Sequence, residues 1–220
     1  MNNESVIVCL PVFNEEKAIE NMIAQLKELP FKIIISDGGS TDKSLQIAKK
    51  EAIDIFHRPG KSKGYGMLQA INLAQKNNIE YIVFIDCDLT YPVDKIPDLV
   101  SQIQSEKYDM VVGRRSTKSM SLKSKILNHI LRNLIYLLFG GNLQDPASGL
   151  RVLRTESYCG NIKEIGMDLE IELTGFSLKK NLLVKEIEVD YYSRVGKSKL
   201  RLQDIIQALF TVFKVRFRQY

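Results

Sequence analysis

The chain has 220 residues, of which 45% are hydrophobic and 26% are charged. That balance allows a sizeable buried core and excludes a disordered chain. A formal net charge of +5 suits an anionic partner, such as a nucleotide, a phospholipid surface or a nucleic acid. The three cysteines contain no CxxC pair, so a disulfide framework and a zinc site are not expected, and reduced thiols are favoured.

The predicted elements alternate between strands and helices. Strands are expected at residues 5–11, 31–35, 53–56, 81–85 and 110–112, and helices at 15–29, 41–51, 64–77 and after Pro92. Further along, strands at 150–153 and 182–189 flank a helix at 168–179, and amphipathic helices cover 123–139 and 202–218. This alternation predicts an α/β fold with a mostly parallel sheet and helices on both faces.

No apolar run approaches the ~20 residues that a membrane-spanning helix needs, and the first residues do not resemble a signal peptide. A cytoplasmic location is therefore expected. One domain is predicted over residues 1–200, followed by a C-terminal amphipathic helix over 201–220.

The first four predicted strands each end in a polar loop. In chain order the loops read LPVFNEE, ISDGGSTDKS, HRPGKSKGYG and DCDLTYP. Parallel strands bring their carboxyl ends to one edge of the sheet, where ligands of such folds bind. The sequence therefore predicts a ligand site built from these loops.

The first three loops each allow two interpretations. Asn14 and Glu15 can cap a helix or contact a ribose or base. Asp37 can close a turn, or accept a hydrogen bond from the N–H edge of a base, which uracil and guanine both offer. Lys61 and Lys63 can approach phosphates or be ordinary solvated lysines. A P-loop is excluded, because Ile55 stands where that motif needs its first glycine.

The fourth loop places Asp86 and Asp88 directly after a buried apolar strand. Two carboxylates so close together repel each other unless a cation lies between them. They can be turn-forming residues, as Asp often is after a strand. The stronger interpretation is a hard divalent cation, Mg²⁺ or Mn²⁺, bound by these carboxylates, phosphate oxygens and water.

Seven motifs resemble those of the family 2 glycosyltransferases of the GT-A fold. The narrower resemblance is to the dolichol-phosphate mannosyltransferase and polyprenyl-phosphate glycosyltransferase branch. The motifs are PVFNEE (11–16), SDGGSTD (36–42), GKSKGYG (60–66), DCDLTYP (86–92), GRR (113–115), DPASGLRV (145–152) and YSRVGKSKL (192–200). The first four are typical of the broad family, and the last two of the lipid-phosphate branch. Two departures are Thr90 and Tyr91, where many relatives carry Gln or Ser followed by His.

The resemblance implies roles for particular residues. Donor binding falls to Pro11, Asn14, Glu15, Asp37, Lys61, Asp86, Ser198 and Lys199. Acceptor binding falls to Arg115, Ser148 and Arg151, and catalysis to Asp88, Asp145 and Arg194. Asp86 and Asp88 are the implied ligands of Mg²⁺ or Mn²⁺. Which of Lys123, Lys125 and Arg132 contacts the acceptor stays open, because this helix aligns poorly.

The implied reaction is an inverting transfer of a hexose, mannose or glucose, from a GDP- or UDP-hexose to a polyprenyl or dolichyl phosphate. The nucleotide-sugar half is expected at about 1–115 and the acceptor half at about 116–200. The helices at 123–139 and 202–218 can lie on the cytoplasmic face of a membrane, or face an ordinary core. The alternatives are a soluble transferase acting on a glycan hydroxyl, with Asp145 as base, and a nucleic-acid-binding protein. The latter is disfavoured because the basic residues are scattered and no nucleic-acid-binding motif is present.

Overall fold

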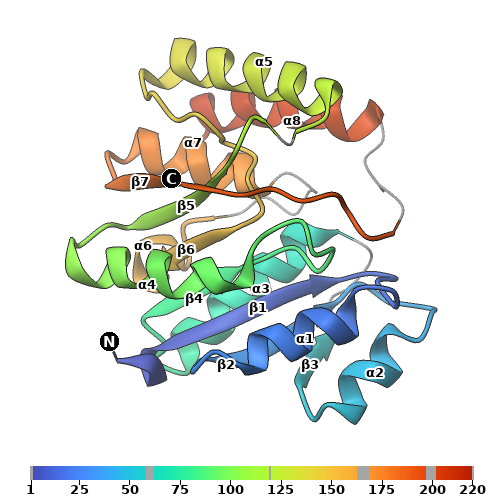
Figure 1. The fold of residues 1–220 in the computed structure, drawn as a ribbon. Coiled ribbons are helices and arrows are strands. Elements are labelled where there is room, and N and C mark those ends of the chain that lie inside the picture. The colour runs from blue at the N-terminus through green and yellow to red at the C-terminus, as the bar shows by residue number, and fades with distance from the viewer. Residues whose placement is uncertain (1, 58–61, 119, 163–168, 197–201, 220) are drawn as a thin grey trace.

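The computed structural model describes residues 2–57, 62–118, 120–162, 169–196 and 202–219. In this part of the chain, one sheet runs through the molecule in the strand order β3-β2-β1-β4-β6-β5-β7 (Figure 1). Its strands are β1 (Val6–Val12), β2 (Lys32–Asp37), β3 (Asp54–His57), β4 (Tyr81–Phe84), β5 (Met110–Arg115), β6 (Arg151–Arg154) and β7 (Val184–Val189).

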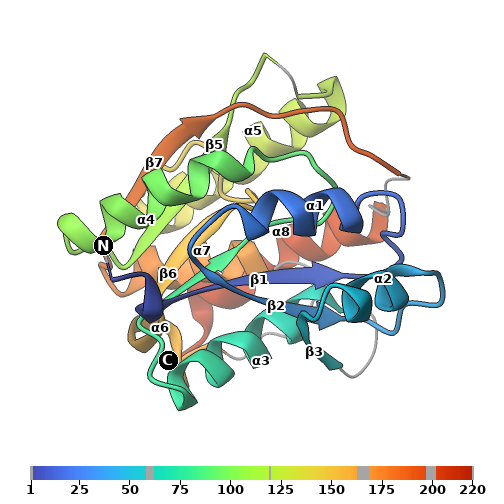
Figure 2. The same cartoon turned by 60° about the horizontal axis from the view of Figure 1, so that its bottom comes forward.

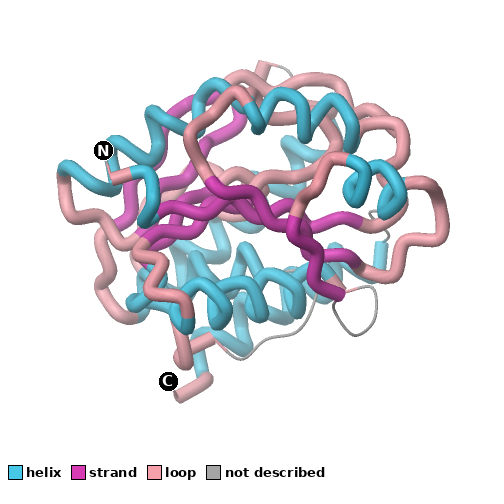
Figure 3. The backbone as a smooth tube through the Cα atoms, turned by 90° about the horizontal axis from the view of Figure 1, so that it is seen from below, coloured by secondary structure: helices cyan, strands magenta, loops and turns pink. Residues whose placement is uncertain are grey.

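The helices form a layer on each face of the sheet, as Figures 2 and 3 show from two sides. Their bounds are α1 (Ile19–Lys27), α2 (Ser44–Lys50), α3 (Lys63–Lys76), α4 (Ile96–Ser105), α5 (Leu122–Phe139), α6 (Thr155–Tyr158), α7 (Leu169–Lys179) and α8 (Leu202–Phe217), with 3₁₀ turns at Asn3–Ser5 and Val93–Lys95. Buried residues of α1, α2 and α4 form the core on one face, and those of α3, α6 and α7 form it on the other. The predicted α/β class with helices on both faces is confirmed.

The pairing of the strands is mostly parallel, as predicted. The pairs β1–β2, β1–β4, β2–β3 and β5–β7 are parallel, whereas β6 runs antiparallel to both β4 and β5. Because the first four strands are mutually parallel, the four polar loops that follow them meet at one edge of the sheet. The antiparallel β6 also brings the loop before it to that edge.

The start of α2 differs from the start predicted at residue 41. The helix begins at Ser44, and the residue before it is Lys43. Ser40 Oγ instead accepts a hydrogen bond from the Asn14 amide at 3.0 Å, and the Thr41 amide donates to Asn14 Oδ1 at 2.8 Å. Ser40 and Thr41 therefore join the loop after β2 to the loop after β1.

A third apolar cluster joins α5, α7 and α8. It contains Leu131 and Ile135 of α5, Ile171 of α7, and Ala208 and Val212 of α8. The far end of α8 is also fixed, because Lys179 Nζ donates to the carbonyls of Val215, Arg216 and Arg218. These contacts make α8 part of the packed structure. The division of the chain into a domain at 1–200 and a C-terminal helix at 201–220 remains a prediction.

We expect Val212→Ala to lower the free energy of unfolding by about 2 kcal/mol, because its side chain is only 1% exposed in that cluster. The neighbouring Phe213 is 44% exposed. Its replacement by alanine is the matched control and should change stability by less than about 0.5 kcal/mol. Urea unfolding followed by circular dichroism measures both. Equal small losses for the two variants would mean that α8 does not contribute to the core.

Candidate active site

Asp86, the first carboxylate after β4, is bound by a lysine from the start of α3. Lys63 Nζ lies 2.5 Å from Asp86 Oδ1 and 2.5 Å from Glu170 Oε1, at the start of α7. Burial opposes ionisation of Asp86, but the adjacent ammonium of Lys63 outweighs it and lowers the pKa of Asp86. Burial likewise opposes the charge of Lys63, yet the two carboxylates raise its pKa. One lysine thus joins two carboxylates from distant parts of the chain.

Asp88 is bound in a similar way by Arg194, which follows β7. Arg194 Nη1 lies 2.8 Å from Asp88 Oδ2, and its Nη2 donates to Glu15 Oε1 at 2.8 Å. The other oxygen of Asp88 accepts hydrogen bonds from the amide and hydroxyl of Thr90. Burial, followed by repulsion from Asp86, raises the pKa of Asp88. Each carboxylate of the pair therefore shares a cation with a glutamate further away.

The segment that carries Arg194 is held across the Asp86–Asp88 loop by main-chain hydrogen bonds. The amide of Tyr192 donates to the carbonyl of Thr90 at 2.9 Å, and that of Val195 donates to the carbonyl of Asp88 at 3.1 Å. Because these bonds fix the backbone on both sides of Arg194, they hold its side chain close to Asp88. Its predicted neighbours Ser198 and Lys199, and Lys61 of the third loop, lie outside the described residues.

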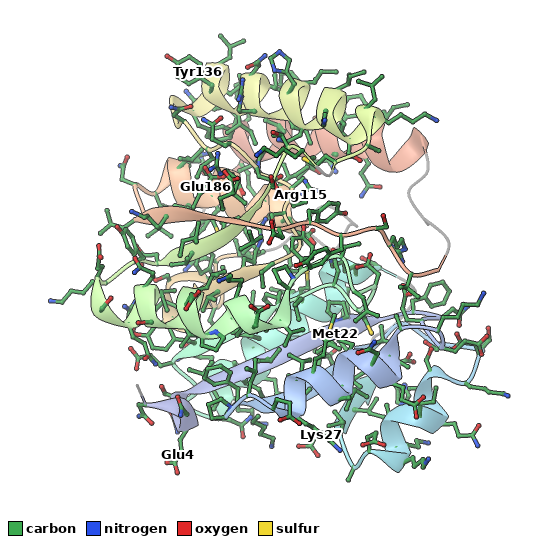
Figure 4. The ribbon with its side chains drawn as sticks, in the orientation of Figure 1. Glu4, Met22, Lys27, Arg115, Tyr136 and Glu186 are labelled. Carbon is green, nitrogen blue, oxygen red and sulfur yellow. The ribbon has the colours of Figure 1, made fainter. Side chains whose placement is uncertain are left out.

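Arg115 and Asp145 form a buried pair at the end of β5. Arg115 donates from Nε and Nη2 to the two oxygens of Asp145, at 2.7 and 2.6 Å, and its amide donates as well. Asp145 is 1% exposed. Its amide donates to Glu186 of β7, which fixes the loop, and Figure 4 shows Arg115 and Glu186 in the same region of the molecule. Both oxygens of Asp145 are therefore engaged by a guanidinium.

The loop before β6 packs directly against Asp86. A Cβ on Gly149 would lie 2.1 Å from Asp86 Oδ2, so only glycine leaves room for that oxygen. The Gly149 amide donates to Tyr91 Oη at 2.7 Å, and Ser148 Oγ donates to the carbonyl of Gly113 at 2.6 Å. The loop is thereby tied to β5 and to the Asp86–Asp88 loop.

Arg151 is fully buried and binds main-chain carbonyls instead of facing open space. It donates to Ser148, Pro146 and Glu170, at distances from 2.6 to 3.3 Å. Burial lowers its pKa. In this geometry Arg151 positions the loop before β6 and the start of α7, while its predicted contact with an acceptor stays a prediction.

Asp37 and Asn14 organise the loops after β2 and β1. The oxygens of Asp37 accept from the amides of Gly39 and Ser40, and one lies 3.3 Å from His57 Nδ1. Asn14 has a φ of 52°, a left-handed conformation that asparagine tolerates better than most residues. Pro11 is buried within β1, next to these loops. The predicted contacts of these residues with a base or ribose stay predictions.

A basic pocket of about 260 Å³ lies beside Arg115, between the segment after β5 and α5. It is lined by Thr117, Met120, Lys125, Asn128, His129 and Arg132. Arg132 and Asn128 both bond to Gln144, the residue before Asp145. Asn128 Oδ1 is buried and accepts no hydrogen bond from the described part of the chain. With Lys125 and Arg132 in its lining, the pocket has the charge to bind an anion.

The cluster around Asp86 and Asp88 has the charge and ligand chemistry for a divalent cation. Its described members are four carboxylates and two cations, with a formal charge of −2: Glu15, Asp86, Asp88, Glu170, Lys63 and Arg194. In the described residues no group of three or more acidic, His or Cys side chains could hold a metal by itself. Mg²⁺ commonly binds one or two carboxylates, with phosphate and water completing its shell. The residues present therefore fit such an ion when it arrives with a nucleotide.

Comparison with known proteins identifies the family of this chain. The model of the family "Glycosyl transferase family 2" matches residues 7–159. An uncharacterized protein of Methanocaldococcus jannaschii is 30% identical over 86% of this chain and 82% of its own length. A dolichyl-phosphate hexose transferase of Haloferax volcanii is 27% identical over 90% of this chain and 87% of its own. The fold is shared by the glucosyl-3-phosphoglycerate synthase of Mycobacterium tuberculosis, whose structure was solved with Mn²⁺, UDP and glucosyl-3-phosphoglycerate. The TM-score is 0.80 and the sequence identity 20%, over 97% of this chain and 80% of that one.

The chain belongs to glycosyl transferase family 2, and it is a glycosyltransferase with the expected GT-A fold. The family predicted from the seven motifs is confirmed. Among the described residues, no helix is long and apolar enough to cross a bilayer.

The structure brings most of the predicted site residues together. Most of the described ones lie at the carboxyl edge of the sheet, either at a strand end, as Asp37 and Arg115 do, or in an adjoining loop. Pro11 lies within β1, and the buried Arg151 supports this edge from within. The sequence analysis did not predict that Glu170, Glu186 and the buried Tyr91 belong to the site. The sequence DLEIEL, in which two glutamates interrupt a buried helix, is a signal for Glu170.

Proposed function

We propose that this glycosyltransferase moves a hexose, with inversion, from a nucleoside diphosphate hexose to a polyprenyl phosphate. The observation that carries the proposal is the cluster with a formal charge of −2 at the carboxyl edge of the sheet, in a chain of this family. The similarity to a dolichyl-phosphate hexose transferase over nearly the full length of both chains supports the choice of acceptor.

The donor side is proposed to comprise the loops after β1, β2 and β4. Asp86 and Asp88 would hold Mg²⁺ or Mn²⁺ together with the donor diphosphate. The bound cation would neutralise the charge that develops on the leaving nucleoside diphosphate. Arg194 is held 2.8 Å from Asp88, close enough to contact the same phosphates. Asp37 and Asn14 would recognise the base and ribose, which can be those of GDP or UDP.

The acceptor side is proposed to comprise Arg115 and the basic pocket beside it. A lipid phosphate there would be ionised near neutral pH and would need no strong general base, so positioning and electrostatics would supply most of the catalysis. The pairing of both Asp145 oxygens with Arg115 supports this view, because a carboxylate held in that way is poorly placed to take a proton. Asp145 is then a residue that orients Arg115.

The pH dependence of the rate tests this acceptor chemistry. We expect the rate to become flat above about pH 7, because the second ionisation of a phosphate monoester lies near 6. The profile of Asp145→Asn should keep this shape, even if its rate is lower. If Asp145 were the base for a hydroxyl acceptor, the variant would lose the ionisation that limits the wild-type rate, and its profile would change shape.

We also propose that α5 and α8 rest on the surface of the bilayer that holds the acceptor. The two helices pack side by side (Figure 1) and expose large apolar residues: Leu122, Ile126, Ile130, Tyr136, Leu137, Ile206, Phe210, Phe213 and Phe217. Lys123, Lys125, Lys214 and Arg216 add positive charge to the same helices. Apolar and basic side chains on such a helix suit an anionic lipid surface. A peripheral position on the cytoplasmic face follows from this proposal.

Vesicle cosedimentation checks the membrane proposal. We expect Phe210→Ser with Phe213→Ser to lower binding to anionic vesicles more than tenfold, since burying a Phe side chain contributes about 1.5–3 kcal/mol. Leu183→Ser is the control, because Leu183 is also exposed but lies before β7. High salt should weaken wild-type binding. Binding that ignores both the double substitution and salt would contradict this surface.

A further inference from the structure

Lys63 and Glu170 belong to the charge cluster, but the transferase chemistry above gives neither of them a task. Lys63 contacts Asp86 and Glu170 at equal distances of 2.5 Å, and its side chain is only 18% exposed. Glu170 is 6% exposed and lies at the start of α7, far from the four loops in sequence. A buried glutamate needs a partner, and Lys63 is the partner that the structure provides.

Arg194 repeats this arrangement on the other carboxylate. It joins Asp88 to Glu15, as Lys63 joins Asp86 to Glu170. Each carboxylate expected to bind the metal is thus neutralised by a cation of the chain, and each of those cations already touches a second carboxylate. A cation that leaves Asp86 or Asp88 is therefore not left unpaired.

We propose that Lys63 is a displaceable counter-ion of the metal site and that Glu170 is the residue that retains it. Without metal, Lys63 neutralises Asp86 and keeps the pair of carboxylates from repelling each other. When a divalent cation takes Asp86, Lys63 remains on Glu170 and beside the incoming phosphates. The inference rests on the proposed function, because it assumes that Asp86 and Asp88 bind the metal.

The proposal gives Lys63 and Glu170 opposite effects on metal affinity. Lys63→Met removes the competitor for Asp86 and should tighten Mn²⁺ binding about tenfold. Glu170→Gln removes the second carboxylate partner of Lys63, so Lys63 can pair only with Asp86. This variant should bind Mn²⁺ about tenfold more weakly, which is within the range of couplings measured in buried charge networks. Both residues are positioning residues, since neither needs to touch the metal.

A double-mutant cycle separates this role from a general electrostatic field. If Glu170 acts through Lys63, Glu170→Gln should change Mn²⁺ affinity less than about twofold once Lys63 is methionine. Mn²⁺ alone is titrated into each full-length variant and binding is followed by water-proton relaxation, which detects weak sites. The exposed pair Lys27–Glu51 gives the matched control cycle, with Lys27→Met and Glu51→Gln expected to leave affinity unchanged. Figure 4 shows Lys27 at the outer edge of the molecule.

An equal effect of Glu170→Gln in both backgrounds would overturn the role of Lys63 but leave the metal site intact. Mn²⁺ binding that is no tighter in wild type than in Asp88→Asn, both for Mn²⁺ alone and with GDP or UDP present, would instead contradict the metal site of the proposed function. If Lys63→Met does not fold, as judged by circular dichroism, Lys63→Gln replaces it in the cycle. The glutamine amide can still donate to one carboxylate but carries no charge to compete with the metal.

Discussion

Replacing Asp88 by asparagine is expected to lower the transfer rate about 10³-fold, because a catalytic metal contributes several kcal/mol and each 1.4 kcal/mol is a factor of ten. Asparagine keeps the size of the side chain and can still accept the hydrogen bonds from Thr90. The fold should therefore persist while the charge that holds the metal is lost. Initial rates with saturating donor, Mg²⁺ and acceptor measure the effect.

Two observations accompany this result if the metal assignment is right. Excess EDTA should abolish the wild-type activity, and Mg²⁺ or Mn²⁺ should restore it. The thermal unfolding of Asp88→Asn should resemble that of wild type, which excludes misfolding as the cause. Full turnover in EDTA, or an Asp88→Asn enzyme within tenfold of the wild-type rate, would contradict a metal at this position.

Replacing Arg115 by alanine is expected to lower the free energy of unfolding by about 3–5 kcal/mol. The change leaves Asp145, which is 1% exposed, as a buried charge without its guanidinium partner. It also removes the contact of the guanidinium with the ring of Tyr191, at 5.4 Å. Urea unfolding measures the loss, which should exceed that of Val212→Ala in the α8 cluster.

The matched control removes both charges. Arg115→Leu with Asp145→Leu should be more stable than Arg115→Ala, because replacing a buried ion pair by apolar residues costs far less than leaving one charge unpaired. An Arg115→Ala protein that loses less than about 1 kcal/mol would show that Asp145 finds water or another partner. In that case Arg115 would not be needed to stabilise Asp145, and its proposed role would be limited to binding the acceptor phosphate.

The fold could be predicted from the sequence because its signals are local. The buried apolar runs that end in Pro11, Asp37 and Asp86 define strands, and the helices between them follow from apolar residues at helical spacing. The direction of β6 could not be predicted in this way, since an apolar strand has the same composition in either direction. Its antiparallel direction depends on its place between β4 and β5, which only the folded sheet shows.

The site was predictable only in part, because some of its contacts join residues that are far apart in the sequence. Carboxylates at a strand end, such as Asp86 and Asp88, reveal a charged site because burying them without a partner is costly. The pairing of Lys63 with Glu170 could not be predicted, because the two residues lie 107 positions apart in the sequence and only the fold brings them together. The surroundings of Arg151 could not be predicted either, because the main-chain carbonyls that it binds, such as those of Ser148 and Glu170, come together only in the folded chain.

The identity of the product tests the central claim most directly. Purified protein is incubated with Mg²⁺ or Mn²⁺, a panel of GDP- and UDP-hexoses and an equimolar mixture of a polyprenyl phosphate and a glycan acceptor, and the products are identified by mass spectrometry. We expect one hexose to be joined to the polyprenyl phosphate, through an ester bond that mild acid cleaves, and no such product from Asp88→Asn. A hexose joined to the glycan hydroxyl, with the polyprenyl phosphate unmodified, would contradict the lipid acceptor and favour a soluble transferase of the same family.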